Sequence, residues 1–388
     1  MQPVIDLDKE YGIVLEGGGA KGAYQVGAWQ ALKEAGIKIK GIAGTSVGAL
    51  NGAMMCMDDL EMAERVWSHL TYSQVMDVED QKMERLLEGD TPFWEALSDV
   101  AKRMGEGGLD ITPLKNLILE VVDEEKIRNS PRELYIKTFS VDELKELDID
   151  LKSVEPGYMK DLLLASAYIY PLFKNEKLHG RKYIDGGAIN NVPLDSLVDR
   201  GYQDIIMIRI FGIGREKRVK IPEGTQIFTI EPRVNLGNII DFNPEKSIRN
   251  MKIGYYDAQR MIYGLQGKIY YIEENEEECY YLRKLLQIPE EARDRLLERY
   301  HTREKGEGRI RAFVENVLPG VAMELKLSRE WTYKELYLAI LEATAKICRV
   351  PKYRVYTVEE LREEVKNRLF RMDAERIEEL PVFVWFLA

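Results

Sequence analysis

The chain has 388 residues, 45% of them hydrophobic and 31% charged, which is typical of folded globular proteins and excludes a disordered or collagen-like chain. Its formal net charge of -11 argues against nucleic acid as a general partner, because phosphate groups need a basic surface. The charge is uneven. Residues 280–388 hold 21 basic and 19 acidic side chains, which leaves 34 basic against 47 acidic in residues 1–279. This division predicts two regions with different roles.

The first predicted elements are a strand, a glycine-rich loop and a helix. An apolar run at 11–15 precedes the stretch EGGGAKG at 16–22, and apolar residues then recur at helical spacing over 23–35. Three consecutive glycines, Gly17 to Gly19, leave main-chain N–H groups uncovered beside a helix N-terminus, which favours a bound anion. In acyl transfer such a loop can hold an oxyanion. A tight turn without a ligand is the alternative.

A second strand at 39–43 ends in the pentapeptide Gly44-Thr45-Ser46-Val47-Gly48, and an apolar helix begins at Val47. A serine between a strand and a helix projects its hydroxyl from a sharp turn, and the flanking glycines avoid a clash across that turn. The pentapeptide alone is weak evidence, but the strand before it and the helix after it are the setting that the motif requires. We therefore expect Ser46 to be a nucleophile.

The rest of the chain predicts the fold class. Residues 58–108 carry apolar side chains at helical spacing and predict a helical insertion or cap. Strand and helix patterns alternate from there to about residue 230, so we expect an α/β fold of three layers, α/β/α, with a mostly parallel sheet. An acidic run at 273–279 separates a catalytic domain at 1–275 from a mostly helical C-terminal extension at 280–388, whose role the sequence does not give.

A third motif, Asp185-Gly186-Gly187, ends a short strand-like stretch. A carboxylate at a strand end, followed by glycines that let another backbone approach, suits a general base for a serine hydroxyl. Such a tripeptide is more often an ordinary turn. It gains weight only beside the other two motifs.

Taken together, EGGGAKGAYQVG, GTSVGALNG and DGGAINNVP resemble, in this order, the motifs of the patatin-like phospholipase family. The segment LLLASAYIYPLF, with Ser166 and Pro171, is similar to the stretch that this family carries between its serine and its aspartate. The resemblance covers roughly residues 10–260. It departs from many members at Glu16, where they have Asp, and from plant members at Gly187, where they have Ala.

The resemblance implies a lipid acyl hydrolase with a Ser-Asp dyad, in which Ser46 attacks a fatty-acyl ester and Asp185 is the general base. Gly17, Gly18 and Gly19 would form the oxyanion hole. The residues that support the motifs are Lys21, Gly22, Gly44, Gly48, Gly186, Gly187 and Pro171. No metal and no cofactor is implied, and activity is expected to fall only when Asp185 is protonated.

Three alternatives stay open. Ser46, Asp185 and His301 occur in the order of an α/β-hydrolase triad, although His301 lies in a highly charged stretch typical of a surface. Gly17, Gly19 and Gly22 fit a dinucleotide-binding fingerprint, but the second strand ends without the acidic residue that this site needs. A catalytically silent scaffold that binds a partner through its C-terminal region is the third.

Two basic windows lie inside the acidic first region and predict where a lipid surface would be met. Residues 209–220 have a net charge of +4 and residues 174–182 of +3. Basic side chains attract anionic membrane lipid, so we expect these windows to flank the mouth of the site, although solvated loops would show the same pattern. Three scattered cysteines and an N-terminus unlike a signal peptide lead us to expect a cytoplasmic protein, peripheral to the membrane at most.

Overall fold

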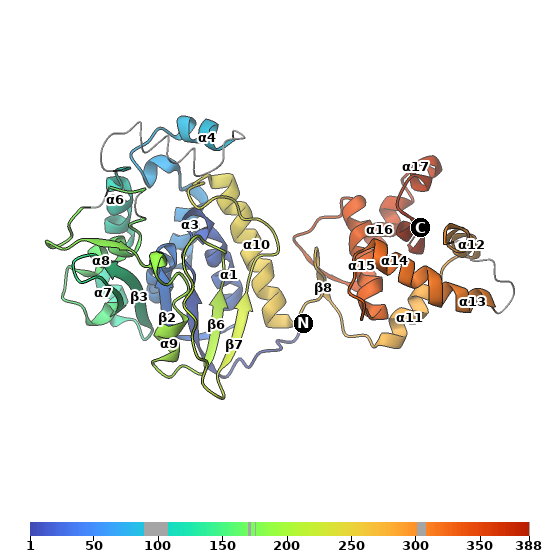
Figure 1. The fold of residues 1–388 in the computed structure, drawn as a ribbon, viewed down its shortest axis with the longest axis horizontal. Helices are drawn as coiled ribbons and strands as arrows, with labels where there is room; N and C mark the ends of the chain where they lie inside the picture. The colour runs from blue at the N-terminus through green and yellow to red at the C-terminus, as the bar shows by residue number, and fades with distance from the viewer. Residues whose placement is uncertain (89–107, 170–171, 175, 301–307, 388) are drawn as a thin grey trace. The chain divides into compact units, whose positions relative to one another are not determined.

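The computed structural model describes residues 1–88, 108–169, 172–174, 176–300 and 308–387 (Figure 1). The chain divides into two compact units, Gln2–Ile262 and Tyr263–Ala388, the second of which also includes Met1. The division falls before residue 275, where the acidic run suggested the end of the first domain. It does so because β8 (Tyr271–Glu273) pairs with β9 (Val355–Thr357) inside the second unit.

The first unit is built on a mixed sheet whose main path runs β4-β3-β2-β1-β6-β7. Its strands are β1 (Glu10–Leu15), β2 (Lys38–Thr45), β3 (Glu133–Ser140), β4 (Lys145–Asp150), β5 (Tyr183–Asp185), β6 (Asp204–Ile208) and β7 (Gln226–Ile230). Strands β3, β2, β1, β6 and β7 are parallel, while β4 and β5 pair antiparallel with β3. The predicted mostly parallel sheet is confirmed.

The register places the loops that follow β1, β2 and β6 at the same end of this sheet. Leu15 at the end of β1 pairs with Gly44 of β2 on one side and with Ile208 of β6 on the other. The chain therefore leaves β1, β2 and β6 at the same edge. The strand order also reverses here, since β2 and β3 lie on one side of β1 and β6 and β7 on the other, and ligand sites form at such switch points.

Helices cover both faces of the sheet, which confirms the three-layer α/β/α core. On one face α9 (Leu194–Val198) packs through Leu197 on Val14 and Ala43. On the other, Gly52 of α2 (Val47–Met57) lies against Ile42, whose side chain points to the opposite face because side chains alternate along a strand.

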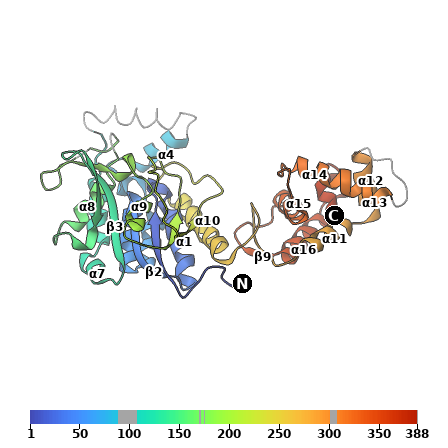
Figure 2. The ribbon, with the colours of Figure 1, turned by 60° about the horizontal axis from the view of Figure 1, so that its bottom comes forward.

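The next helix layer depends on a backbone-to-backbone contact. Helix α1 (Ala23–Glu34) lies beside α10 (Pro244–Tyr263), as Figures 1 and 2 show. A Cβ atom on Gly27 of α1 would stand 1.8 Å from the carbonyl oxygen of Met251, and one on Gly254 of α10 would stand 1.9 Å from that of Tyr24. Glycine at both positions is what allows the two helices to approach this closely.

The predicted insertion at 58–108 begins as two helices, α3 (Leu60–His69) and α4 (Asp80–Glu88). Its residues 89–107 lie outside the described part of the chain. Helix α3 buries Ala63 and Trp67, and the Asp59 carboxylate caps it by accepting the N–H of Met62. The unit also contains α6 (Thr112–Val121), α7 (Glu124–Asn129) and α8 (Met159–Ser166).

The second unit is mostly helical, as predicted, around an apolar core of its own. Its helices are α11 (Glu278–Leu286), α12 (Glu290–Arg299), α13 (Gly308–Ala312), α14 (Leu318–Glu324), α15 (Tyr333–Ile347), α16 (Val358–Leu369) and α17 (Ala374–Glu378). The buried carboxylate of Glu342 accepts the N–H groups of Lys268, Ile269 and Tyr270 and so fixes the turn at which the unit begins. Within the described ranges no helix is both long and apolar enough to cross a bilayer.

Candidate active site

Ser46 lies on a strained turn between β2 and α2. Its backbone has φ 55° and ψ -125°, a conformation that residues other than glycine rarely adopt and that is common at functional sites. A Cβ atom on Gly44 would stand 2.3 Å from the Gly48 carbonyl oxygen, and one on Gly48 would stand 2.3 Å from that of Leu15. The close approach across the turn is therefore what requires both glycines of the pentapeptide.

Asp185 lies at the end of β5, opposite Thr138 of β3, and its buried carboxylate lines the same cavity as Ser46. The Gly187 N–H donates a hydrogen bond to Oδ1 of this carboxylate at 2.7 Å. Burial raises the pKa of Asp185 to about 6, although the nearby Ser46 hydroxyl and the Gly187 N–H act in the opposite direction. Above this pH the group is a carboxylate beside the serine hydroxyl, which is the arrangement that a general base needs.

The glycine loop offers N–H groups beside the serine, but not all of those that the sequence suggested. The Gly17 N–H donates to the Asn191 carbonyl at 3.0 Å and is therefore occupied. The N–H groups of Gly18 and Gly19 have no acceptor among the described residues. The Val47 N–H, in the first turn of α2, is a further donor, and sequence reasoning missed it although it follows the motif serine directly.

A buried carboxylate fastens this loop to the segment after β6. Glu16 accepts the N–H groups of Ile210, Phe211 and Gly212 at 2.7, 3.0 and 3.2 Å. Arg209 donates its Nε to the same carboxylate at 3.0 Å, and the Lys21 ammonium donates to the Phe211 carbonyl at 2.7 Å. The sequence marked Glu16 only as a departure from the family pattern, whereas the structure shows that it holds two loops of the site together.

Ser166, at the end of α8, holds the serine turn from the other side. Its Oγ accepts the Ser46 N–H at 2.9 Å and donates to the Lys137 carbonyl at 2.7 Å. Gly186 also lies against this carbonyl, because a Cβ atom on it would stand 2.6 Å away. One main-chain oxygen of β3 thus positions both the turn at Ser46 and the turn at Asp185. Pro171 of the same predicted segment lies outside the described residues.

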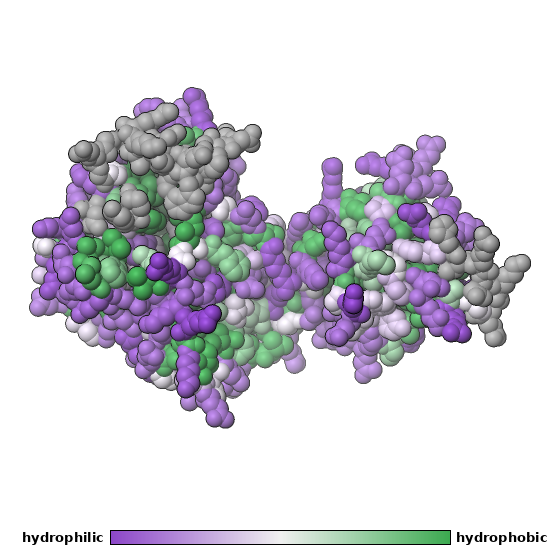
Figure 3. All heavy atoms as spheres, viewed as in Figure 1, coloured by the Kyte–Doolittle hydropathy of each residue, from purple (hydrophilic) through white to green (hydrophobic). Residues whose placement is uncertain are grey.

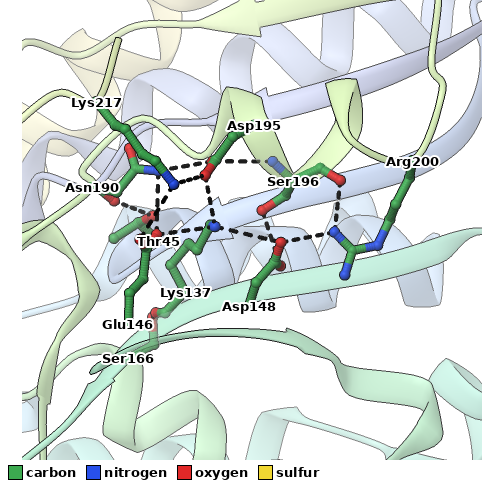
Figure 4. A network of polar contacts seen from close by, with 10 residues as sticks. All are labelled: Thr45, Lys137, Glu146, Asp148, Ser166, Asn190, Asp195, Ser196, Arg200 and Lys217. Atoms are coloured by element: carbon green, nitrogen blue, oxygen red, sulfur yellow. Dashed lines mark hydrogen bonds and ion pairs between the residues drawn. The ribbon is translucent and has the colours of Figure 1, made fainter. Parts of the chain in front are cut away.

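The buried side chain of Lys137 lies at the centre of a partly buried ion network (Figure 4). Its ammonium contacts the carboxylates of Glu146, Asp148 and Asp195 at 3.0, 3.4 and 3.1 Å. Burial alone would lower the pKa of Lys137, but these three carboxylates outweigh it and raise that pKa. Lys217 joins the network through Asp195, and Arg200 joins it through Asp148.

Removing the central cation is expected to destabilise the fold. In Lys137→Met three carboxylates, of which that of Asp195 is buried, lose their shared buried partner, and breaking a buried ion pair on one side typically costs about 3–5 kcal/mol. The free energy of unfolding in urea measures the loss. The matched control is Lys217→Met, because the Lys217 side chain is 49% exposed against 3% for Lys137, and it is expected to lose about 1 kcal/mol or less. Equal losses in the two variants would contradict this account of the network.

Two cavities meet at Ser46. The first, called the polar cavity because its wall is the more polar of the two, contains Gly18, Ser46, Asp185 and Asn191 in that wall. The second has an almost wholly apolar wall and about 790 Å³ of space free of protein atoms, part of which is open to solvent. Its wall is made of residues from α2, α3, α6 and the segment 239–242. Gly19, Ser46, Ile169 and Ile239 belong to both cavities, so an ester held at Ser46 can extend a polar part and an apolar part in different directions.

The histidines that the structure describes do not line either cavity at Ser46. His69 forms a hydrogen bond with the Arg65 carbonyl, and His179 pairs with Asp161 and stacks on Tyr158. His301, the histidine of the triad alternative, lies outside the described residues. In the described ranges no group of three or more His, Cys, Asp or Glu side chains is placed to hold a metal.

Comparison with known proteins finds a family match within the first unit and several similar relatives. The sequence pattern of patatin-like phospholipases matches residues 13–198. A patatin-like phospholipase domain-containing protein of Caenorhabditis elegans is 27% identical over 203 residues, 50% of this chain and 13% of the relative. A lysophospholipase of Aspergillus terreus is 56% identical over 50 residues, 13% of this chain and 3% of the relative. The chain thus corresponds to a small part of each relative.

The crystal structure of VipD from Legionella pneumophila covers 97% of this chain, and this chain covers 83% of VipD, at 14% identity and a TM-score of 0.42.

Proposed function

Since residues 13–198 place the chain in the patatin-like phospholipase family, we propose that it is a serine-dependent lipid acyl hydrolase of the phospholipase A or esterase type. The observation that carries this proposal is that Ser46, on its strained turn, lines the same cavity as the buried carboxylate of Asp185. Free main-chain N–H groups beside the serine support it further, because acyl transfer needs donors where negative charge develops.

The proposed reaction has two stages. Asp185 accepts the Ser46 proton while the serine oxygen attacks the ester carbonyl, and the N–H groups of Gly18, Gly19 and Val47 bind the oxyanion. The carbon–oxygen bond to the alcohol then breaks, and the alcohol leaves with the proton from Asp185. Water next gives its proton to Asp185 and attacks the acyl-enzyme, which releases the fatty acid and restores the Ser46 hydroxyl. No step uses a metal or a cofactor.

The apolar cavity supports a fatty-acyl substrate. Leu50 and Met54 of α2 lie four and eight residues after Ser46 and both line the cavity. Residues four apart share one face of a helix, and a rise of 1.5 Å per residue puts Met54 about 12 Å from the serine along the helix axis. We infer that the acyl chain lies along this face of α2, with its far end near Met54.

Shortening the cavity at Met54 is expected to change the preferred acyl length. In Met54→Trp the larger side chain excludes the last few methylenes, and each methylene that stays in water forgoes about 0.8 kcal/mol of transfer free energy. We expect kcat/KM for a 16-carbon p-nitrophenyl ester to fall by about 10- to 100-fold relative to the 4-carbon ester. The matched control is Met57→Trp, one turn further along α2 and outside this cavity, which should leave the ratio unchanged. A parallel fall for both esters in Met54→Trp would contradict the assignment.

Labelling by a fluorophosphonate tests the proposed function directly. The reagent phosphonylates an activated serine, so mass spectrometry of a digest should find the adduct on Ser46. A chain that labels nowhere would be a scaffold and would overturn the proposal.

Replacement of His301 by alanine separates a dyad from a triad, because a dyad enzyme keeps its activity whereas a triad enzyme loses it.

The compartment and the membrane contact are further parts of the proposal. Cys56, Cys279 and Cys348 are all free thiols, which supports a reducing, cytoplasmic setting. Of the two basic windows, 174–182 is partly neutralised, because Arg181 pairs with Glu143 and His179 with Asp161. We propose that the protein meets anionic lipid mainly through the window 209–220.

A further inference from the structure

The loop after β6 exposes two apolar side chains to solvent, although hydrogen bonds to other segments hold its backbone in place. Phe211 is 49% exposed and Ile213 is 51% exposed. Phe211 has φ +48°, a conformation that bulky residues avoid and that persists only where the surroundings impose it. Here the Glu16 carboxylate holds the Phe211 N–H and the Lys21 ammonium holds its carbonyl, so the exposed ring sits on a fixed support.

The same loop is joined to the aspartate turn. The Arg215 N–H donates to the Gly187 carbonyl at 2.9 Å, and the Arg215 carbonyl accepts the Asn191 N–H at 2.7 Å. Ile213 lines the polar cavity together with Ser46 and Asp185. Ile213 therefore lies at the rim of the cavity in which the proposed chemistry occurs, and Phe211 lies two residues before it.

Ion pairs inside the fold leave an uncompensated positive charge on this loop. Arg209 is paired with Glu16 and Glu216, and Lys217 with Asp195. The side chains of Arg215, Arg218 and Lys220 have no acidic partner among the described residues. Three cations thus remain next to two exposed apolar side chains, in a unit whose total charge is negative. Figure 3 shows that hydrophobic patches lie between hydrophilic residues on the face of this unit that is turned to the viewer.

We propose that residues 211–220 form a docking surface for an anionic lipid bilayer, which places the rim of the Ser46 cavity on the membrane. The inference rests on the proposed function for its purpose, because a lipid acyl hydrolase must take its substrate from a bilayer. Phe211 and Ile213 enter the interfacial region, where apolar side chains are favoured, and the three cations bind the anionic headgroups. Among possible partners, a bilayer matches a surface that is both apolar and cationic.

The experiment measures vesicle binding with the full chain carrying Ser46→Ala, so that no lipid is consumed. Cosedimentation is compared for vesicles of phosphatidylcholine alone and with 30 mol% phosphatidylserine, roughly the anionic content that gives such attraction. In this background, Arg218→Glu with Lys220→Glu is expected to weaken binding to the anionic vesicles by about 30-fold or more. Phe211→Asn, which tolerates the positive φ, is expected to weaken binding by about tenfold.

The matched control is Lys38→Glu with Lys40→Glu, which makes the same charge change at the start of β2, the end opposite Ser46, and should bind vesicles normally. With Ser46 intact, Arg218→Glu with Lys220→Glu should leave hydrolysis of soluble p-nitrophenyl butanoate unchanged. Equal anionic-vesicle binding by the loop variant and the parent overturns the docking surface. If soluble esters are cleaved but vesicles do not bind, the surface is wrong and the proposed function stands. If vesicles bind through the loop but no ester is cleaved, the surface stands and the proposed function is wrong.

Discussion

Replacing Ser46 by alanine is expected to reduce ester hydrolysis by about 10⁵- to 10⁶-fold, because the step that forms the acyl-enzyme loses its nucleophile. The measurement is kcat/KM on a p-nitrophenyl ester. Alanine removes one hydroxyl and keeps the main-chain N–H of residue 46, which Ser166 accepts, so the turn should remain in place. A far-ultraviolet circular dichroism spectrum unchanged from that of the parent separates lost chemistry from lost folding.

The matched control for this prediction is Ser328→Ala, an exposed serine of the second unit, which is expected to keep full activity. A Ser46→Ala protein that retained a tenth of the parental kcat/KM would show that another group attacks the ester. It would therefore remove the basis of the dyad.

Replacing Asp185 by asparagine is expected to lower kcat by about 10³- to 10⁴-fold, the range typical of a lost general base. The amide keeps an oxygen that can accept the Gly187 N–H but cannot take the Ser46 proton. In the parent enzyme, protonation of Asp185 at low pH should have the same effect as the substitution. Its kcat/KM should rise with pH through an apparent pKa of about 6, as the carboxylate forms, and then stay level. Asp199→Asn, at an exposed position beyond α9, is the matched control and should change neither quantity.

The same substitution is expected to make the protein more stable at pH 8. The pKa of Asp185 is about 6 in the folded state against 3.8 ordinarily, so the folded state holds the proton more tightly than the unfolded state. As pH rises between these values the parent therefore loses stability, by about 3 kcal/mol for a shift of about two units. Asparagine carries no charge, so the gain is full above pH 6 and absent below about pH 4. Equal urea stability of Asp185→Asn and its parent at pH 8 would contradict the buried, uncompensated carboxylate.

Glycine and serine spacing was sufficient to predict the tight turn at Ser46, since Gly44 and Gly48 are required by the contacts that the structure shows. Short apolar runs likewise predicted β1, β2 and β6, because buried parallel strands have little polar surface. These features are local: the residues that determine them lie within a few positions of one another. The alternating Leu147 and Ile149 of β4 were missed because charged neighbours hid a short edge strand.

Features that depend on distant residues could not be predicted in this way. Glu16 looks like a variant of a motif aspartate, and its contacts with Ile210 and Gly212 become visible only when β1 and β6 pair. In the sequence, Lys137 is a single charged residue within a strand pattern. Nothing near it in the sequence indicates that Asp195 lies beside it. The hydrogen bond of the Gly17 N–H could not be predicted either, because its acceptor, the Asn191 carbonyl, belongs to a motif far along the chain.

The two cavities that meet at Ser46 have a consequence for the order in which products leave. In the proposed reaction the fatty chain still occupies the apolar cavity when the acyl-enzyme has formed, while the departing alcohol leaves the polar cavity. We then expect the second nucleophile to arrive through the polar cavity, past Asp185. Under this proposal, competition between water and other hydroxyl compounds for that cavity would set the balance between hydrolysis and acyl transfer. The apolar cavity would then select the lipid, and the polar cavity would select the product.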